Sequence, residues 1–181
     1  MSEAFYLSDP DGLGIEVDAD RPRATWRRRG RELRMTTDPV DLPGILAAAG
    51  DASWTGLPDG STMGHVHLHV GDLELASRFY SQALGLDRMV WSYPGALFLS
   101  AGGYHHHLGT NIWAGTAARP SAADEAQLLE WSLELPDAAA LGSAAESLAQ
   151  AGFAAEPVAG AVRTRDPWGT ALRLGTSRGG R

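Results

Sequence analysis

The chain has no cysteine and no lysine, and each absence limits what it can do. Without thiols it can form neither disulfides nor thiolate metal sites, and a cysteine nucleophile is excluded. All fifteen basic residues are arginine, and 22 acidic residues outnumber them, which leaves a formal net charge of −7. We therefore expect no nucleic-acid binding through the general surface of the protein.

The sequence also has no apolar run that approaches the roughly 18 residues of a membrane-spanning helix. Its first residues, MSEAFYLSDPDG, contain no basic segment followed by an apolar one, so we expect no signal peptide. Hydrophobic residues make up 44% of the 181 residues and charged residues 20%, which is typical of a globular protein. A cytoplasmic protein without membrane contacts is the expectation.

The first 62 residues have little regular pattern. Residues 1–20 predict a β-hairpin, because the apolar runs AFYLS and LGIEV flank the turn sequence DPDG. Residues 21–62 predict a linker with a short helix near residues 41–50. Seven of the fifteen arginines lie between Arg21 and Arg34. We interpret that stretch as a solvated linker, with an anion-binding patch as the alternative.

A regular pattern begins at residue 63. The sequence HVHLHV alternates imidazole and aliphatic side chains, as a strand with one buried face does. Asp72 then caps a predicted helix with an apolar face, and three strand-like runs follow. Residues 63–115 therefore predict the order β-α-β-β-β.

The same order recurs in residues 127–176, with Asp137 in the capping position, so the chain contains an internal repeat of about 60 residues. Residues 63–176 are expected to form one complete module and residues 177–181 a tail. The DPWG sequence at Asp166 resembles DPDG at Asp9. The opening hairpin is therefore interpreted as the remnant of another unit.

Two β-α-β-β-β units with GHVHLHVGDLELASRFYSQALGL at the front, and a DPDGLGIEV ending, resemble the vicinal oxygen chelate superfamily. This superfamily includes glyoxalases, bleomycin-resistance proteins and extradiol dioxygenases. The stretches GGYHHHLGTNIWAG and SWTGLPDGS resemble its bacterial catechol-2,3-dioxygenase-like branch. The resemblance implies an α+β fold in which paired units form a half-open barrel around a cavity.

The resemblance also implies a divalent metal, iron(II) in the dioxygenases, held by two histidines and one glutamate. In the complete module the corresponding positions are occupied by His65, His107, Glu130 and Arg173. A guanidinium cannot bind a metal, and Arg173 stands where the family has its glutamate. Two interpretations remain: a rearranged site of His65, His107 and Glu130, or an ion pair between Glu130 and Arg173 without any metal.

Glu16, in the hairpin, matches the glutamate of the family without departure. The resemblance implies that its two histidine partners belong to a module upstream of Met1, so the chain resembles an N-terminally truncated member. No histidine of the present chain is expected near Glu16. His67 and Tyr104 are further candidates for an acid–base or substrate-orienting role, and no organic cofactor site is predicted.

The function implied is that of an iron(II)-dependent catechol 2,3-dioxygenase-like oxidoreductase of aromatic degradation, acting on a small aromatic molecule with an incomplete metal site. The alternatives are a metal-free module that binds a small molecule, as bleomycin-resistance proteins do, and a structural or dimerising module. The exposed edges of the hairpin favour a homodimer or a complementing N-terminal half as the partner.

Overall fold

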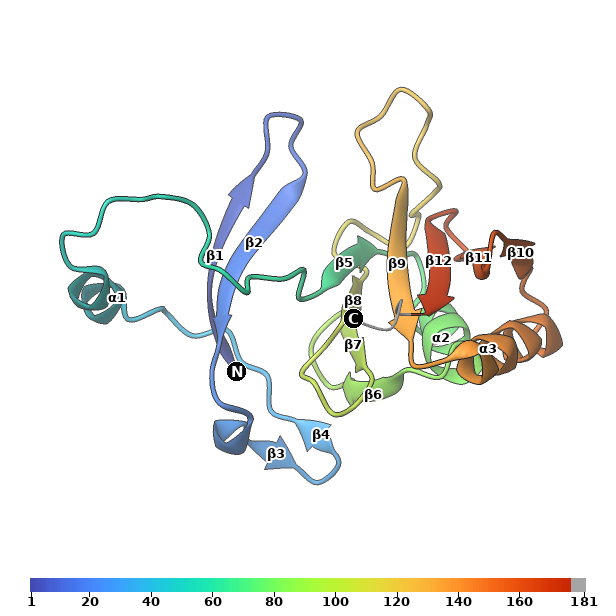
Figure 1. Ribbon diagram of the computed structural model, residues 1–181, viewed down its shortest axis with the longest axis horizontal. Helices are drawn as coiled ribbons and strands as arrows, with labels where there is room; N and C mark the ends of the chain where they lie inside the picture. Colours follow the sequence, from blue (N-terminus) through green and yellow to red (C-terminus); the bar gives the residue numbers. More distant parts are fainter. Residues whose placement is uncertain (177–181) are drawn as a thin grey trace.

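The computed structural model describes residues 1–176; the predicted tail, residues 177–181, lies outside this range. The chain has the α+β fold that the sequence predicts, with two four-stranded mixed sheets and two small two-stranded ones (Figure 1). No helix within residues 1–176 is both long enough and apolar enough to cross a bilayer.

The first four-stranded sheet belongs to the unit that begins with the histidine-rich strand. Its elements are β5 (Val66–His69), α2 (Leu73–Ala76), η2 (Ser77–Ala83), β6 (Asp87–Val90), β7 (Ala96–Ser100) and β8 (Leu108–Asn111). The strand order is β5-β8-β7-β6, and β5 runs parallel to β8. The Asp72 carboxylate accepts a hydrogen bond from Leu75 N at 2.9 Å and caps α2, which continues into the π-helical turns of η2.

The second sheet repeats this order of elements. It contains β9 (Glu130–Leu135), α3 (Ala138–Gln150), β10 (Glu156–Val158), β11 (Ala161–Arg165) and β12 (Ala171–Thr176). The strand order is β10-β11-β12-β9, and β12 runs parallel to β9. Asp137 caps α3 by accepting a hydrogen bond from Ala140 N at 2.8 Å, as the sequence predicts.

Both units share one hydrophobic core. The alternation of β5 places Leu68 and Val70 in it, together with Phe79 and Tyr80 of η2. The second unit contributes buried side chains from β9, α3, β11 and β12, namely Trp131, Leu148, Val162, Leu172 and Leu174. Because the apolar faces of the sheets are turned to this core, the histidine face of β5 is directed away from it, toward the N-terminal segment.

The N-terminal segment consists of the hairpin β1 (Ser2–Ser8) and β2 (Gly14–Asp20), the short η1 (Arg23–Thr25), β3 (Arg28–Arg29), β4 (Glu32–Leu33) and the helix α1 (Leu42–Ala49). A second, smaller core joins it to the first sheet. This core contains Leu33, Met89, Val90, Ala96 and Phe98 as buried residues. Strand β7 is therefore buried on both faces.

Candidate metal centre

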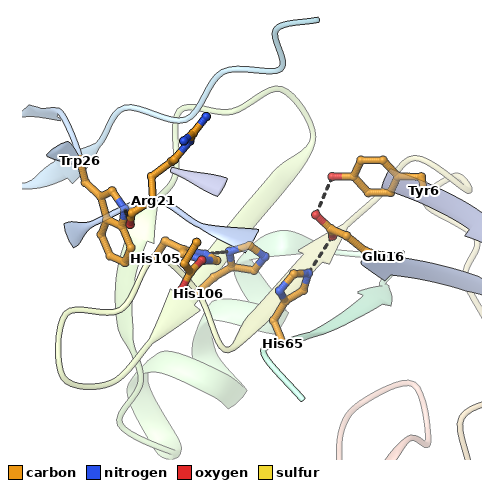
Figure 2. A network of polar contacts seen from close by, with 8 residues as sticks. Tyr6, Glu16, Arg21, Trp26, His65, His105 and His106 are labelled. Carbon is orange, nitrogen blue, oxygen red and sulfur yellow. Dashed lines mark hydrogen bonds and ion pairs between the residues drawn. The ribbon is translucent and has the colours of Figure 1, made fainter. Parts of the chain in front are cut away.

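The hairpin and the histidine-rich unit meet at one short contact. His65 Nε2 lies 2.8 Å from Glu16 Oε2, and the side chains are 7% and 18% exposed (Figure 2). The hydroxyl of Tyr6 donates to the other carboxylate oxygen of Glu16, at 2.9 Å. The expectation that no histidine lies near Glu16 is therefore wrong. The two residues are 49 positions apart in the sequence: Glu16 lies in β2, and His65 immediately precedes β5.

The local pattern of the hairpin explains why acidic groups face the histidines. Side chains of a strand alternate between its faces, so Glu16, Asp18 and Asp20 of β2 share one face. In the antiparallel register Tyr6 pairs with Glu16, which places both side chains on that face. The sequence reading missed this acidic row, although its spacing of two residues was visible within GIEVDAD.

A second contact lies beside the first. His105 Nε2 is 2.8 Å from Asp20 Oδ1, and His105 Nδ1 is 2.6 Å from His106 Nδ1. A carboxylate only accepts, so His105 donates through Nε2 and accepts through Nδ1. His106 therefore donates through Nδ1, which leaves a lone pair on its Nε2. Figure 2 shows that ring nitrogen on the side of His65, whose ring centroid is 4.1 Å from that of His106.

We refer to this group as the histidine–carboxylate cluster. It consists of Glu16, Asp18, Asp20, His65, His105 and His106. The ligand atoms of Asp18, Asp20 and His105 all lie within 4.8 Å of one another. Two of its buried atoms, His65 Nδ1 and Asp18 Oδ2, have no hydrogen-bond partner within the described chain. Buried polar atoms are normally satisfied, so these two mark a place where a further group fits.

The electrostatics of the cluster follow from burial and from the contacts. Burial opposes ionisation of Glu16, but hydrogen bonds from His65 and Tyr6 outweigh it and lower the pKa of its carboxyl. Burial also opposes charge on His65, yet Glu16 raises its pKa above the ordinary value. The pair therefore favours a carboxylate facing an imidazolium. Burial and the hydrogen bond to Glu16 raise the pKa of Tyr6 to about 12.

His105 and His106 are electrostatically different from His65. Burial lowers the pKa of His105 despite its contact with Asp20. Burial, followed by the charge of His65, lowers the pKa of His106 to about 2. Both rings are therefore neutral at neutral pH, and a neutral imidazole is the form that binds metals. The cluster thus offers imidazole and carboxylate ligands, the donor set typical of non-heme iron(II) sites.

The other residues predicted for the metal are placed differently. His107 Nδ1 accepts a hydrogen bond from Ala101 N at 3.2 Å and lies 3.0 Å from Ser100 Oγ, at the end of β7. The reason is that residues 104–107 form an irregular turn and not the beginning of the predicted strand, which starts only at Leu108. The turn brings His106, not His107, next to His65.

Glu130 lies at the start of β9 in the second sheet and forms an ion pair with Arg163, at 2.7 Å. The predicted ion pair between Glu130 and Arg173 is therefore wrong. Arg173 is paired in register with Ser132 of β9, whereas Ala171 is the neighbour of Glu130. The guanidinium of Arg163, on β11, which neighbours β12 and not β9, reaches the carboxylate instead.

His67 and Tyr104 flank the cluster without joining it. The His67 ring lies 5.8 Å from that of Phe98 and 5.5 Å from that of Trp113. Desolvation and the charge of His65 lower the pKa of His67 to about 4, so the ring is neutral at neutral pH. Burial and the nearby Asp20 raise the pKa of Tyr104, so its hydroxyl stays protonated at neutral pH.

A cavity of about 520 Å³ opens between the N-terminal segment and the turn that joins β6 to β7. Arg29, Thr37 and Tyr93 are among its lining residues, and Thr37 Oγ1 lies 2.9 Å from Tyr93 Oη. Phe98 links it to the cluster, since its ring centroid is 5.7 Å from that of Tyr93 and 5.0 Å from that of His106. Its volume is within the range of small-molecule sites.

Two solved structures resemble the fold. A glyoxalase/dioxygenase from Nostoc punctiforme superposes with a TM-score of 0.53 and 16% sequence identity, over 68% of this chain and 97% of that protein. A glyoxylase/bleomycin resistance protein/dioxygenase domain from Frankia sp. EAN1pec gives a TM-score of 0.52 and 24% identity, over 65% of this chain and 98% of that domain. At these identities the likeness concerns the fold alone.

Sequence comparison is more specific. The catechol-2,3-dioxygenase of Bacillus subtilis (strain 168) is 48% identical over 170 residues, which are 92% of this chain and 59% of that protein. This chain thus spans about three fifths of the length of its curated relative. The sequence profile of the Glyoxalase/Bleomycin resistance protein/Dioxygenase superfamily matches residues 62–174. The chain is a catechol-2,3-dioxygenase-like member of this superfamily, and it belongs to it by both sequence and fold.

Proposed function

We propose that the chain forms part of an extradiol dioxygenase that opens the ring of a catechol beside its hydroxyl groups. The observation that carries the proposal is the contact of Glu16 with His65, 2.8 Å across the boundary between hairpin and module. The similarity to the Bacillus subtilis catechol-2,3-dioxygenase supports it, because this similarity includes 92% of the chain. We further propose that residues 63–176 form one complete half-open barrel module behind this site.

We assign the metal to Glu16, His65 and His106. These residues offer one carboxylate and two imidazoles. Glu16 Oε2 faces His65 Nε2 at 2.8 Å, so a metal held between them would replace the proton of this contact and would have to compete with the imidazolium form of His65. An iron(II) ion held by them would supply Lewis-acid and redox chemistry at the point where a catechol meets oxygen. Asp20 and His105 act as positioning residues, because their contact selects the tautomer of His106.

The remaining polar groups have roles that follow from their protonation. Tyr6 donates to Glu16 and fixes the orientation of its carboxylate. His67 is neutral at neutral pH and shares the face of β5 with His65, so it is our candidate for accepting a proton from a substrate hydroxyl. The ring-opened product takes up both atoms of one oxygen molecule, and the reaction needs no external reductant.

The first test is metal binding. The metal-free protein is titrated with cobalt(II) under anaerobic conditions, and binding is followed by visible absorption and equilibrium dialysis. We expect one ion per chain, and affinity at least about tenfold weaker in Glu16→Gln and in His65→Ala, since each removes a ligand. Binding that is absent from the wild type, or unaffected by both substitutions, contradicts this assignment.

The second test is turnover. Protein reconstituted with iron(II) is mixed with catechol in air, and oxygen uptake is recorded together with absorption of the yellow ring-opened product. We expect turnover that disappears with the iron and with His65→Ala. If the protein binds the metal but consumes no oxygen, the assignment of the metal centre stands and the proposed dioxygenase activity is contradicted.

The cavity beside Tyr93 favours one other function, binding of a small molecule without metal. Its 520 Å³ and the guanidinium of Arg29 suit a small anionic aromatic compound. Binding of catechol or benzoate to the metal-free protein, weakened by Tyr93→Ala and not by His65→Ala, would support this alternative.

A further inference from the structure

The connection between β7 and β8 carries three consecutive histidines, and its backbone alone does not fix which of them faces His65. We call residues 101–107 the histidine turn. Gly102 and Gly103 have positive φ angles, of 62° and 70°, and a Cβ added to either would meet no atom within 4 Å. Two successive glycines in this region leave the backbone many conformations, so contacts from outside the turn must fix the direction of each imidazole.

The outside contacts come from residues 20–26, at the end of the hairpin. Asp20 Oδ1 lies 2.8 Å from His105 Nε2. The ring of Trp26 packs edge to face on the same imidazole, with ring centroids 5.3 Å apart and an interplanar angle of 66°. Figure 2 shows His105 between the indole of Trp26 and the ring of His106. Since His105 is 1% exposed, its ring can rotate only if these neighbours move.

Trp26 is itself held in place by backbone acceptors. Its indole Nε1 donates a hydrogen bond to Arg21 O at 2.9 Å, and its backbone N donates to Arg23 O at 3.1 Å, at the end of η1. The side chain also packs against the smaller core that joins the N-terminal segment to the first sheet. The indole therefore presents a fixed ring to His105.

Arg23 contacts the histidine turn at a second point. Its Nη1 donates to Gly102 O at 3.2 Å. Its guanidinium carbon lies 5.5 Å from the ring centroid of Tyr104 and 5.7 Å from that of Trp26, and a guanidinium is attracted to an aromatic face. Tyr104 and Trp26 also meet edge to face, with centroids 5.9 Å apart. These three side chains connect residues 20–26 to the histidine turn.

The direction of His105 determines the state of His106. The two Nδ1 atoms are 2.6 Å apart, and His105 donates through Nε2 to Asp20, so the proton between the two rings belongs to His106. His106 Nε2 then keeps its lone pair on the side of His65 (Figure 2). A rotation of His105 would break the contact between the rings and would no longer select this tautomer.

We propose that Trp26 and Arg23 are positioning residues of the metal centre. They hold the histidine turn in the arrangement that directs His106 toward His65. Neither supplies a ligand atom, and both act through the turn and His105. The functional meaning of this inference rests on the proposed metal centre, whereas the state of the imidazoles can be measured without any metal.

The test records the tautomer of each histidine by long-range proton–nitrogen NMR of the metal-free full chain. In the wild type we expect His106 to carry its proton on Nδ1. Trp26→Leu keeps an apolar side chain on the smaller core and removes the aromatic ring beside His105. The ratio of the Nδ1–H to the Nε2–H tautomer of His106 should therefore fall roughly tenfold. Trp26→Phe restores a ring and should return the ratio to within about twofold of the wild type.

Two controls separate positioning from general packing. Met35→Ala removes another side chain that packs against the smaller core, and it should leave the tautomer ratio of His106 unchanged. Arg23→Met alters an exposed position, where folding is not at risk, and it should lower the ratio about threefold. Arg27→Met, which changes an exposed arginine of the same stretch, should leave the ratio unchanged.

Cobalt(II) affinity then connects the arrangement to the metal. We expect it to be about tenfold weaker in Trp26→Leu and unchanged in Met35→Ala. The proposal is overturned if the wild type does not hold His106 as the Nδ1–H tautomer, or if Trp26→Leu and Arg23→Met both retain it. It is also overturned if Met35→Ala shifts the ratio as far as Trp26→Leu does. A wild type that binds no cobalt(II) contradicts the proposed metal centre, and the tautomer ratios still decide whether Trp26 and Arg23 position His106.

Discussion

Tyr80 Oη donates a hydrogen bond to Asp166 Oδ2 at 2.7 Å, and both residues are buried. The tyrosine belongs to η2 in the first unit, and the aspartate begins the β11–β12 turn of the second. Burial, the adjacent carboxylate and the hydrogen bond hold the pKa of Tyr80 well above its ordinary value, so it remains a donor. The contact joins the two units through their common core.

Removing this donor should weaken the whole module. In Tyr80→Phe the Asp166 carboxylate loses its partner inside the core, and we expect a loss of about 1–3 kcal/mol in the free energy of unfolding. Urea denaturation followed by far-ultraviolet circular dichroism measures it. Tyr93→Phe, whose hydroxyl contacts Thr37 near the surface, is the matched control and should cost below about 0.5 kcal/mol. Equal effects of the two substitutions would contradict this account.

Glu32 predicts a dependence of stability on pH. Its Oε1 accepts hydrogen bonds from Trp91 N at 2.7 Å and Ser92 N at 2.6 Å, and it ties β4 to the turn after β6. Burial opposes its ionisation, but these hydrogen bonds prevail and lower the pKa of its carboxyl. A lowered folded pKa stabilises the protein above the ordinary glutamate pKa of about 4.3, and the stabilisation is lost as the pH falls through the folded pKa.

The corresponding substitution is Glu32→Gln. At neutral pH it should destabilise the protein by about 1.5–3 kcal/mol, because two backbone donors lose a charged acceptor. The difference from the wild type should shrink below roughly pH 4.3. Guanidinium denaturation at several pH values measures it. A difference that is constant down to pH 3 would show that the ionised carboxylate has no special role.

The proposed assignment of metal ligands distinguishes residues that bind the metal from residues that do not. His106→Ala should weaken cobalt(II) binding at least about tenfold, whereas His107→Ala should not, because His107 is directed to Ser100. Glu130→Gln should leave the affinity unchanged as well, since Glu130 contacts Arg163. Loss of the metal in His107→Ala or Glu130→Gln, with binding retained in His106→Ala, would restore the assignment made from the sequence alone.

Gly109 determines the position of His67. A Cβ atom at residue 109 would lie 2.9 Å from His67 Nδ1 on the neighbouring strand, so Gly109→Ala must displace the ring. We expect a loss of roughly 1–3 kcal/mol in stability and a shifted imidazole resonance of His67 in NMR spectra. Gly142→Ala in α3, where a Cβ meets no atom within 4 Å, is the control and should stabilise by roughly 0.5–1 kcal/mol. An unmoved His67 resonance in Gly109→Ala would contradict the argument.

Several features could be read directly from the sequence because they depend on neighbours in the chain. Asp72 and Asp137 cap the helices that follow them, and the alternation of HVHLHV separates Leu68 and Val70 from the histidines. The two repeats follow from the same local patterns, as does the α+β class. Capping, alternation and turn chemistry all operate over a few residues, so a single sequence contains them in full.

The resemblance in sequence predicted that Glu16 and His65 stand at family metal positions, but it assigned them to different modules and could not place them together. Strand alternation indicates only that Glu16, Asp18 and Asp20 share a face; which surface that face meets depends on the docking of the hairpin against β5. Likewise, the turn at residues 104–107 brings His106 rather than His107 toward His65. In the second sheet, Arg163 of β11 rather than Arg173 of β12 reaches Glu130. Contacts between elements far apart in the chain result from the packing of whole faces, and only the tertiary structure decided them.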